Sequence, residues 1–172
     1  MKILILIFVT LHLVNGAAEG ELQYGDIISV SKTCGCTGFT YKHYGIYLDK
    51  NRFDKQGADD NIFHFTGLKK KAILGGCIFD KINIQNYEKD NYLDKIENYR
   101  KKVSIEEITK RINEKYEHCR KKKDVWEAFS NNCEHLANYI RYGEKISLQV
   151  CGLLKQSGRV YILLLNCQLF DM

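Results

Sequence analysis

A cysteine at the start of an expected helix is the residue in this sequence that is best suited to chemistry. The segment 131–143 reads NNCEHLANYIRYG, in which Asn132 is a good N-cap, Cys133 the first helical residue and Gly143 a natural stop. Glu134 complements the positive end of the helix dipole. A helix N-terminus lowers a thiol pKa from its free value of about 8.5, and the thiolate is the form that attacks a carbonyl carbon. The segment therefore predicts a cysteine nucleophile.

A thiol nucleophile needs a base within hydrogen-bonding reach and a third group that orients the base. The chain has five histidines. His12 lies in an N-terminal apolar segment, His118 beside a basic run, where it is expected to be exposed, and His135 on the expected helix, rotated away from the thiol. We therefore assign His43 as the base, and His64 as the group that hydrogen-bonds His43 and fixes its tautomer.

The two histidines lie on segments with the composition of β-strands. Strands are expected at 24–30 (YGDIISV), 40–48 (TYKHYGIYL) and around 62–65 (IFHF). Alternation in the second strand puts Tyr41 and His43 on one face. The second and third strands are expected to pair as a hairpin with a long polar connection.

The middle of the chain is less regular and precedes a clear helix. Residues 72–84 could form one or two strands, and residues 86–102 are expected to be irregular. Ser104 and Glu107 form a capping-box pattern, followed by apolar residues at helical spacing: Ile105, Ile108, Ile112, Tyr116 and Cys119. The apolar side of the nucleophile helix and its thiol are expected to face the sheet that carries His43. Together these segments predict an α+β fold, a small antiparallel sheet packed against helices.

Four segments in a fixed order carry a resemblance to a known family. GDIISV followed by YKHYGIYL, then FHF, then NNCEHLANYIRYG, resemble the lecithin:retinol acyltransferase and H-Ras-like suppressor family of permuted papain-like thiol enzymes. The resemblance covers roughly residues 24–143 and implies a circularly permuted papain-like fold. It implies that His43 is the base, His64 its partner and Cys133 the residue that becomes acylated.

The resemblance also implies which groups bind the oxyanion. Tyr41 matches a family tyrosine close to the site, where its hydroxyl could bind the oxyanion, with the backbone N–H of Cys133 as a second donor. Asn132 supports this arrangement as the residue that precedes the nucleophile.

The implied activity is thiol-dependent acyl transfer from a phospholipid through a Cys133 thioester. Water as the acceptor would make the protein a phospholipase A, and an amine or alcohol would make it an acyltransferase. Three alternatives stay open: a permuted papain-like peptidase or amidase, a secreted disulfide-stabilised binding protein without catalysis, and a family member that has lost access to its substrate. We expect no organic cofactor and no metal, because Cys34-x-Cys36 has no matching second pair and the histidines lack ligand spacing. No nucleic-acid partner is expected either.

The chain of 172 residues suits one domain, preceded by a targeting segment. Residues 1–18 have the pattern of a cleavable signal peptide, which places the protein in the secretory pathway, secreted or lumenal. Residues 22–145 are the expected catalytic domain, and 146–172 a C-terminal extension of uncertain structure. The apolar stretch 160–170 is too short for a membrane span, so no convincing transmembrane anchor is expected.

Charge and cysteine content add two further expectations. The net charge is +5, and clusters of lysine and arginine could support peripheral contact with an anionic membrane, although such runs are more often solvated faces. The seven cysteines could form three disulfides in any of 15 ways and leave one thiol free. A catalytic cysteine must be the free one.

Overall fold

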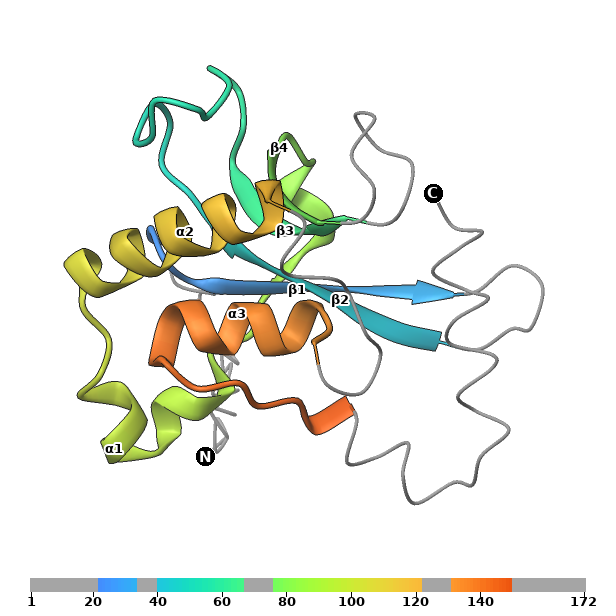
Figure 1. The fold of residues 1–172 in the computed structure, drawn as a ribbon. Helices are drawn as coiled ribbons and strands as arrows, with labels where there is room; N and C mark the ends of the chain where they lie inside the picture. The colour runs from blue at the N-terminus through green and yellow to red at the C-terminus, as the bar shows by residue number, and fades with distance from the viewer. Residues whose placement is uncertain (1–21, 34–39, 67–75, 122–130, 150–172) are drawn as a thin grey trace, which may run out of the picture.

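The computed structural model describes residues 22–33, 40–66, 76–121 and 131–149 (Figure 1). The expected signal peptide, the apolar stretch 160–170 and four of the seven cysteines lie outside these residues: Cys34, Cys36, Cys151 and Cys167. The described residues form the predicted α+β fold, in which a five-stranded antiparallel sheet of order β4-β3-β2-β1-β5 packs against helices. Circular permutation relative to papain stays a prediction.

Three of the strands are those expected from the sequence. The strands run Ile27–Thr33 (β1), Thr40–Tyr47 (β2), Ile62–Thr66 (β3), Gly76–Asp80 (β4) and Glu88–Lys89 (β5). β2 and β3 form the predicted antiparallel hairpin, with Ile46 opposite Phe63 and Tyr47 opposite Ile62. β1 begins three residues later than expected, because residues 24 and 25 form a turn that the Asp26 N–H closes by donating to the Gln23 carbonyl at 2.9 Å.

The segment 72–84 contributes one described strand rather than two. After β4, the side chain of Asn61 takes the place of a neighbouring strand: it donates to the Ile82 carbonyl at 3.0 Å and accepts from the Ile82 N–H at 2.9 Å. Asn83 then caps a 3₁₀ turn at Ile84–Asn86 by accepting from the Gln85 N–H. Local side-chain hydrogen bonds therefore end the extended conformation here.

Residues 86–102, expected to be irregular, contain short regular elements. Besides β5 they include a 3₁₀ turn at Tyr92–Lys95 and a single helical turn, α1, at Glu97–Arg100. None of these is longer than four residues, which is too short for a hydrophobic period to be visible in the sequence.

The two longer helices match the sequence patterns. α2 spans Ile105–Arg120, and the Ser104 side chain caps it by accepting from the Glu107 N–H, as expected. Its buried face follows the predicted spacing except that Ile105 is 52% exposed and Lys115 is buried. α3 spans Cys133–Tyr142, between the predicted N-cap Asn132 and Gly143 in the left-handed conformation at φ 82°.

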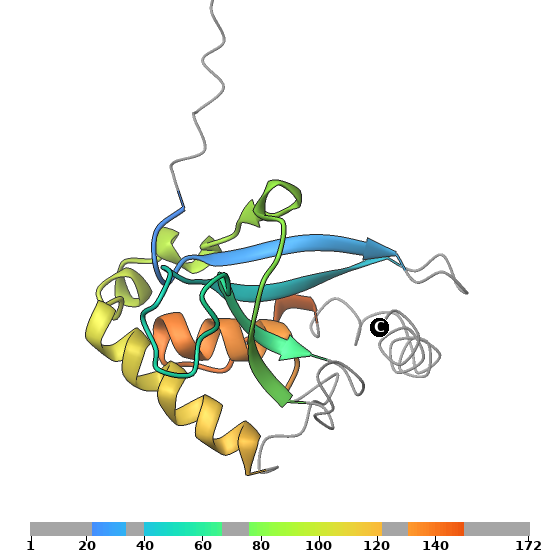
Figure 2. The ribbon, with the colours of Figure 1, turned by 90° about the horizontal axis from the view of Figure 1, so that it is seen from above.

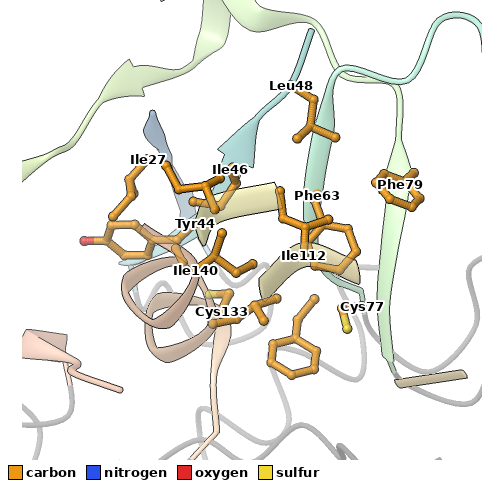
Figure 3. Packing of buried hydrophobic residues seen from close by; sticks show 14 of the residues in the cluster. Ile27, Tyr44, Ile46, Leu48, Phe63, Cys77, Phe79, Ile112, Cys133 and Ile140 are labelled. Carbon is orange, nitrogen blue, oxygen red and sulfur yellow. The ribbon is translucent and has the colours of Figure 1, made fainter. Parts of the chain in front are cut away.

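Both helices lie on the same side of the sheet, whose strands curve around α3 (Figure 2). The core between these layers contains aliphatic and aromatic side chains of β1 to β4, α2 and α3, and includes Cys133 beside Tyr44 and Ile140 (Figure 3). None of the helices in the described part of the chain has both the length and the apolar character needed to cross a membrane.

A disulfide joins the sheet to α2. Cys77 on β4 and Cys119 near the end of α2 are bonded; their Cα atoms are 5.6 Å apart, and the two residues are separated by 42 positions in sequence. It therefore fixes β4, at one edge of the sheet, against the helix that covers it.

Replacing both cysteines tests this bridge. A Cys77→Ser/Cys119→Ser variant is expected to lose about 4 kcal/mol of unfolding free energy, because a cross-link over a loop of this length restricts the unfolded chain. Urea unfolding with and without reductant measures the loss. If reductant lowers the stability of the double variant as much as that of the unchanged protein, the stabilising bridge lies elsewhere.

Candidate active site

The first turn of α3 is held in place by side chains on both sides of Cys133. The Asn132 Oδ1 accepts from the N–H groups of Glu134 and His135, each at 3.0 Å. The His135 Nδ1 accepts in return from the Asn132 N–H at 3.3 Å, which completes a capping box. Asn132 thus supports the site as a cap, and His135 has a structural role, consistent with its exclusion as the base.

Cys133 is a buried free thiol. Its side chain is 2% exposed, and its Sγ lies 3.9 Å from the carbonyl oxygen of Lys42, the residue before His43 in β2. Burial raises the pKa of the Cys133 thiol to about 11, and the charge of Glu134 adds to the increase. Burial therefore outweighs the expected lowering of this pKa by the helix N-terminus. Removal of the thiolate from water costs more free energy than its interaction with the helix dipole supplies.

His43 and His64 are brought together as predicted. The His43 Nε2 lies 2.8 Å from the His64 Nδ1, and the two rings meet edge to face with centroids 5.0 Å apart. Since Nε2 of His43 bonds to His64, Nδ1 is the nitrogen through which His43 would exchange a proton with the thiol.

A glycine permits this approach of the two strands. Gly45 shares the face of His43, two residues along β2, and a Cβ atom at Gly45 would lie 2.4 Å from Ile62 Cδ1 and 3.2 Å from His64 Cβ. The first contact is shorter than van der Waals packing permits, and the second is tighter than most. Only a residue without a side chain lets β3 cross here with His64 directed toward His43.

The thiol meets β2 at the edge of the strand. The apolar side of α3 packs on the face that carries Tyr44 and Ile46, opposite to the face of His43. The side-chain amide of Gln149 accepts from the Lys42 N–H at 2.8 Å and donates to the Lys42 carbonyl at 3.1 Å, so that it occupies the hydrogen-bonding groups that β3 would otherwise use. The expectation that helix and thiol both face the sheet of His43 is met, but the sulfur reaches this strand at its edge.

Asp80 is a site residue that sequence analysis missed. It ends β4, is 8% exposed, and its Oδ2 lies 3.5 Å from the His64 Nε2. Its other oxygen, Oδ1, accepts from the Lys81 N–H at 2.9 Å. The signal in the sequence was a carboxylate directly after the apolar run Cys77–Phe79, but only the pairing of β4 with β3 shows that it lies behind a histidine.

Glu134 ties the chain that follows α3 to the site. This carboxylate is 1% exposed, and it accepts from the Tyr92 hydroxyl at 2.9 Å, the Ser147 hydroxyl at 2.6 Å and the N–H groups of Leu148 and Gln149. Four donors satisfy a charge that would otherwise be costly to bury. Glu134 thereby places Gln149 against Lys42.

The end of α3 is fixed by a second buried charge. Arg141 binds the Asp94 carboxylate through two nitrogens, at 3.2 and 2.7 Å, and donates to the Gly25 carbonyl at 2.8 Å. The Tyr142 hydroxyl donates to the same Asp94 at 2.8 Å. The RYG part of the motif therefore anchors the helix on the side away from the thiol.

The remaining residues considered in the sequence analysis have distinct places. Tyr41 is half-buried on β2, on the face of His43, and its role as an oxyanion donor stays a prediction. His118 is exposed on α2, as expected. Within residues 22–33, 40–66, 76–121 and 131–149, no group of three or more His, Cys, Asp or Glu side chains could hold a metal ion.

Comparison with known proteins finds one family whose model matches most of the chain. A family model described as lecithin retinol acyltransferase matches residues 20–146, a range that contains His43, His64 and Cys133. The chain is also similar to lecithin retinol acyltransferase of Mus musculus, with 29% identity over 142 residues that cover 73% of this chain and 56% of the mouse protein. The chain thus spans about half the length of this relative. No solved structure matches the chain significantly.

The raised pKa of Cys133 predicts the pH dependence of its reactivity. Alkylation of the Cys133 peptide by iodoacetamide in the native protein is expected to be slow at pH 7 and to keep rising beyond pH 10, because only half of this thiol is ionised at a pH of about 11. Peptide mapping by mass spectrometry separates this thiol from the other cysteines. A rate that levels off below pH 8 would instead show a thiolate paired with an imidazolium in the resting protein.

A Gly45→Ala substitution tests the close approach of β2 and β3. We expect a loss of about 1–3 kcal/mol in unfolding free energy from overpacking, together with a large loss of turnover as His64 moves away from His43. Ile62→Val removes the closest clashing atom and serves as the matched background. Stability should recover in part in Gly45→Ala/Ile62→Val relative to Gly45→Ala, because Cγ1 of residue 62, 2.6 Å from the added Cβ, remains. An unaltered stability of the single variant would contradict the packing argument.

Proposed function

The chain belongs to the lecithin retinol acyltransferase family, and from this premise we propose that it transfers an acyl group from a phospholipid through a thioester on Cys133. The observation that carries the proposal is the juxtaposition of a free, buried thiol at the capped start of α3 with the strand that bears the bonded pair of His43 and His64. A nucleophile, a base and a group that orients the base are the parts that thiol catalysis requires.

In the first step, Cys133 loses its proton to the Nδ1 of His43 as Sγ attacks the ester carbonyl. The developing oxyanion is bound by the Cys133 N–H at the helix start and by the Tyr41 hydroxyl. The bond between the acyl carbon and the ester oxygen then breaks. His43 returns the proton to that oxygen, so that a lysophospholipid leaves and a thioester remains.

The second step regenerates the thiol. His43 takes a proton from water, an amine or an alcohol as this acceptor attacks the thioester carbonyl, and the bond between carbon and sulfur breaks with return of the proton to Cys133. Because the resting thiol is neutral, proton transfer to His43 must accompany attack in the first step. His43 is thus required for each turnover and does not serve only to keep a thiolate in reserve.

The surroundings of the sulfur favour a lipid acyl donor over a peptide. Cys133 belongs to the hydrophobic cluster that includes Tyr44, Leu136 and Ile140. A thioester formed there has apolar neighbours, which suit a fatty-acyl chain better than a peptide backbone with its unmet hydrogen bonds.

We further propose that residues 22–145 act as the catalytic domain and that residues 1–18 direct the chain into the secretory pathway. The Cys77–Cys119 disulfide supports this route, since disulfides persist in oxidising compartments and are rare in the cytosol.

Mass spectrometry tests the intermediate. Incubation with phosphatidylcholine should add a fatty-acyl mass to the peptide that contains Cys133, and this mass should be released by hydroxylamine. Cys133→Ser and His43→Ala are each expected to lower kcat by a factor of about 10² to 10⁴. His118→Ala is the matched control, because this histidine is exposed on α2. Full turnover by Cys133→Ser, or faster cleavage of a matched amide than of the ester, would contradict phospholipid acyl transfer.

A further inference from the structure

We propose that Asp80 is a positioning residue that sets the tautomers of both histidines, so that His43 presents an unprotonated Nδ1 to Cys133. The inference rests on the proposed function. It adds a buried carboxylate to the site and gives the carboxylate a definite task, which is to hold the proton on the Nε2 of His64.

The fold places this carboxylate directly behind His64. β4 pairs with β3 so that Asp80 lies opposite Ile62 and Ile78 lies opposite His64. Asp80 is therefore the diagonal neighbour of His64 on the same face of the sheet. The Asp80 Oδ2 faces the His64 Nε2 at 3.5 Å, and the two side chains are 11% and 7% exposed. A carboxylate so shielded from water interacts strongly with the imidazole beside it.

The charge of Asp80 also affects the pKa of the neighbouring Tyr87. Burial raises the pKa of its phenol, and the charges of Asp80 and Cys133 raise it further. The Asp80 carboxylate thus acts on a second side chain besides the one that it faces across 3.5 Å.

The tautomers follow from the order of the three side chains. A neutral imidazole has one N–H donor and one bare acceptor nitrogen. The Asp80 carboxylate, 3.5 Å from the His64 Nε2, attracts an N–H group there and repels a bare lone pair, which favours the proton on Nε2. The Nδ1 of His64 is then an acceptor, and the Nε2 of His43 must donate to it across 2.8 Å. His43 is left with a bare Nδ1, the nitrogen that can take a proton from the thiol.

The opposite arrangement would disable the base. With the proton of His64 on Nδ1, that ring donates to the Nε2 of His43, and the remaining proton of His43 lies on Nδ1. The thiol of Cys133 would then face an N–H group that cannot accept a proton. The same hydrogen bond between the two rings is compatible with both arrangements, so a group beyond His64 must choose between them.

The backbone of Lys81 makes an asparagine at position 80 a precise probe. The Lys81 N–H donates to the Asp80 Oδ1 at 2.9 Å and requires an acceptor there. In Asp80→Asn the carbonyl oxygen keeps this place, and the NH₂ group faces His64. Because NH₂ is a donor, it pairs with a bare Nε2 and selects the tautomer that disables His43.

Histidine NMR on the unchanged protein is the first test. In ¹⁵N-histidine-labelled full chain near pH 8, long-range ¹H–¹⁵N correlation spectra assign the protonated nitrogen of each ring, with His43→Gln and His64→Gln used for assignment. We expect Nε2–H on both rings in the unchanged protein and Nδ1–H on both in Asp80→Asn. A proton on the Nδ1 of His64 in the unchanged protein overturns the proposal without any reference to activity.

Kinetics with phosphatidylcholine give the second test. Asp80→Asn is expected to lower kcat by about a hundredfold with little change in KM, since base catalysis is impaired while the substrate contacts remain. Asp59→Asn is the matched control, because Asp59 pairs with Lys81 at 2.9 Å on the exposed surface. If Asp80 had only a structural role, Asp80→Ala, which loses the Lys81 bond, would be impaired, whereas Asp80→Asn would keep the kcat and the tautomers of the unchanged protein.

The two proposals fail in distinguishable ways. Full turnover by Cys133→Ser removes the thioester mechanism. Loss of turnover in Cys133→Ser, combined with unchanged tautomers and kcat in Asp80→Asn, leaves the mechanism in place and removes the role of Asp80.

Discussion

The close approach of β2 and β3 at Gly45 is the constraint on which the arrangement of the site depends. Because Gly45 has no side chain, Ile62 and His64 can lie across it, and His64 then reaches His43. Beyond this crossing, the backbone groups of Lys42 bond to Gln149 instead of β3, and the sulfur of Cys133 lies at the same carbonyl. The glycine at position 45 thus lets the two histidines meet close to the place where the start of α3 reaches the edge of β2.

The residues around the nucleophile serve mostly to hold it in place. Asn132 and His135 cap the helix, and Glu134 binds the chain after the helix through four hydrogen bonds. At the other end, Arg141 and Tyr142 share the Asp94 carboxylate. The buried charges of Glu134 and Arg141 are each satisfied by several hydrogen bonds, which is the condition under which burial of a charge is tolerated. Most of the polar residues in the segment 131–143 therefore hold the helix that carries the sulfur of Cys133 in place.

The electrostatics of Cys133 constrain the chemistry that we propose. A helix N-terminus favours a thiolate, but full burial opposes it, and the pKa of about 11 shows that burial dominates in the resting protein. A neutral thiol needs a base that accepts its proton during attack, and the base must be in the correct tautomer. In the proposed mechanism, the row of side chains from His43 through His64 to Asp80 meets this requirement.

The sequence by itself determined the nucleophile helix with both of its caps, the strands of His43 and His64, their hairpin and the amphipathic α2, because these depend on local patterns of period 2 or 3.6 and on capping residues. It did not determine the short elements of residues 82–102, where side-chain hydrogen bonds from Asn61 and Asn83 override the strand pattern. Only the tertiary structure decided the pKa of Cys133, the approach of the thiol at a strand edge and the position of Asp80. Burial and the pairing of β3 with β4 bring together atoms that are distant in sequence, and a linear pattern contains no information about which of them will share a desolvated space.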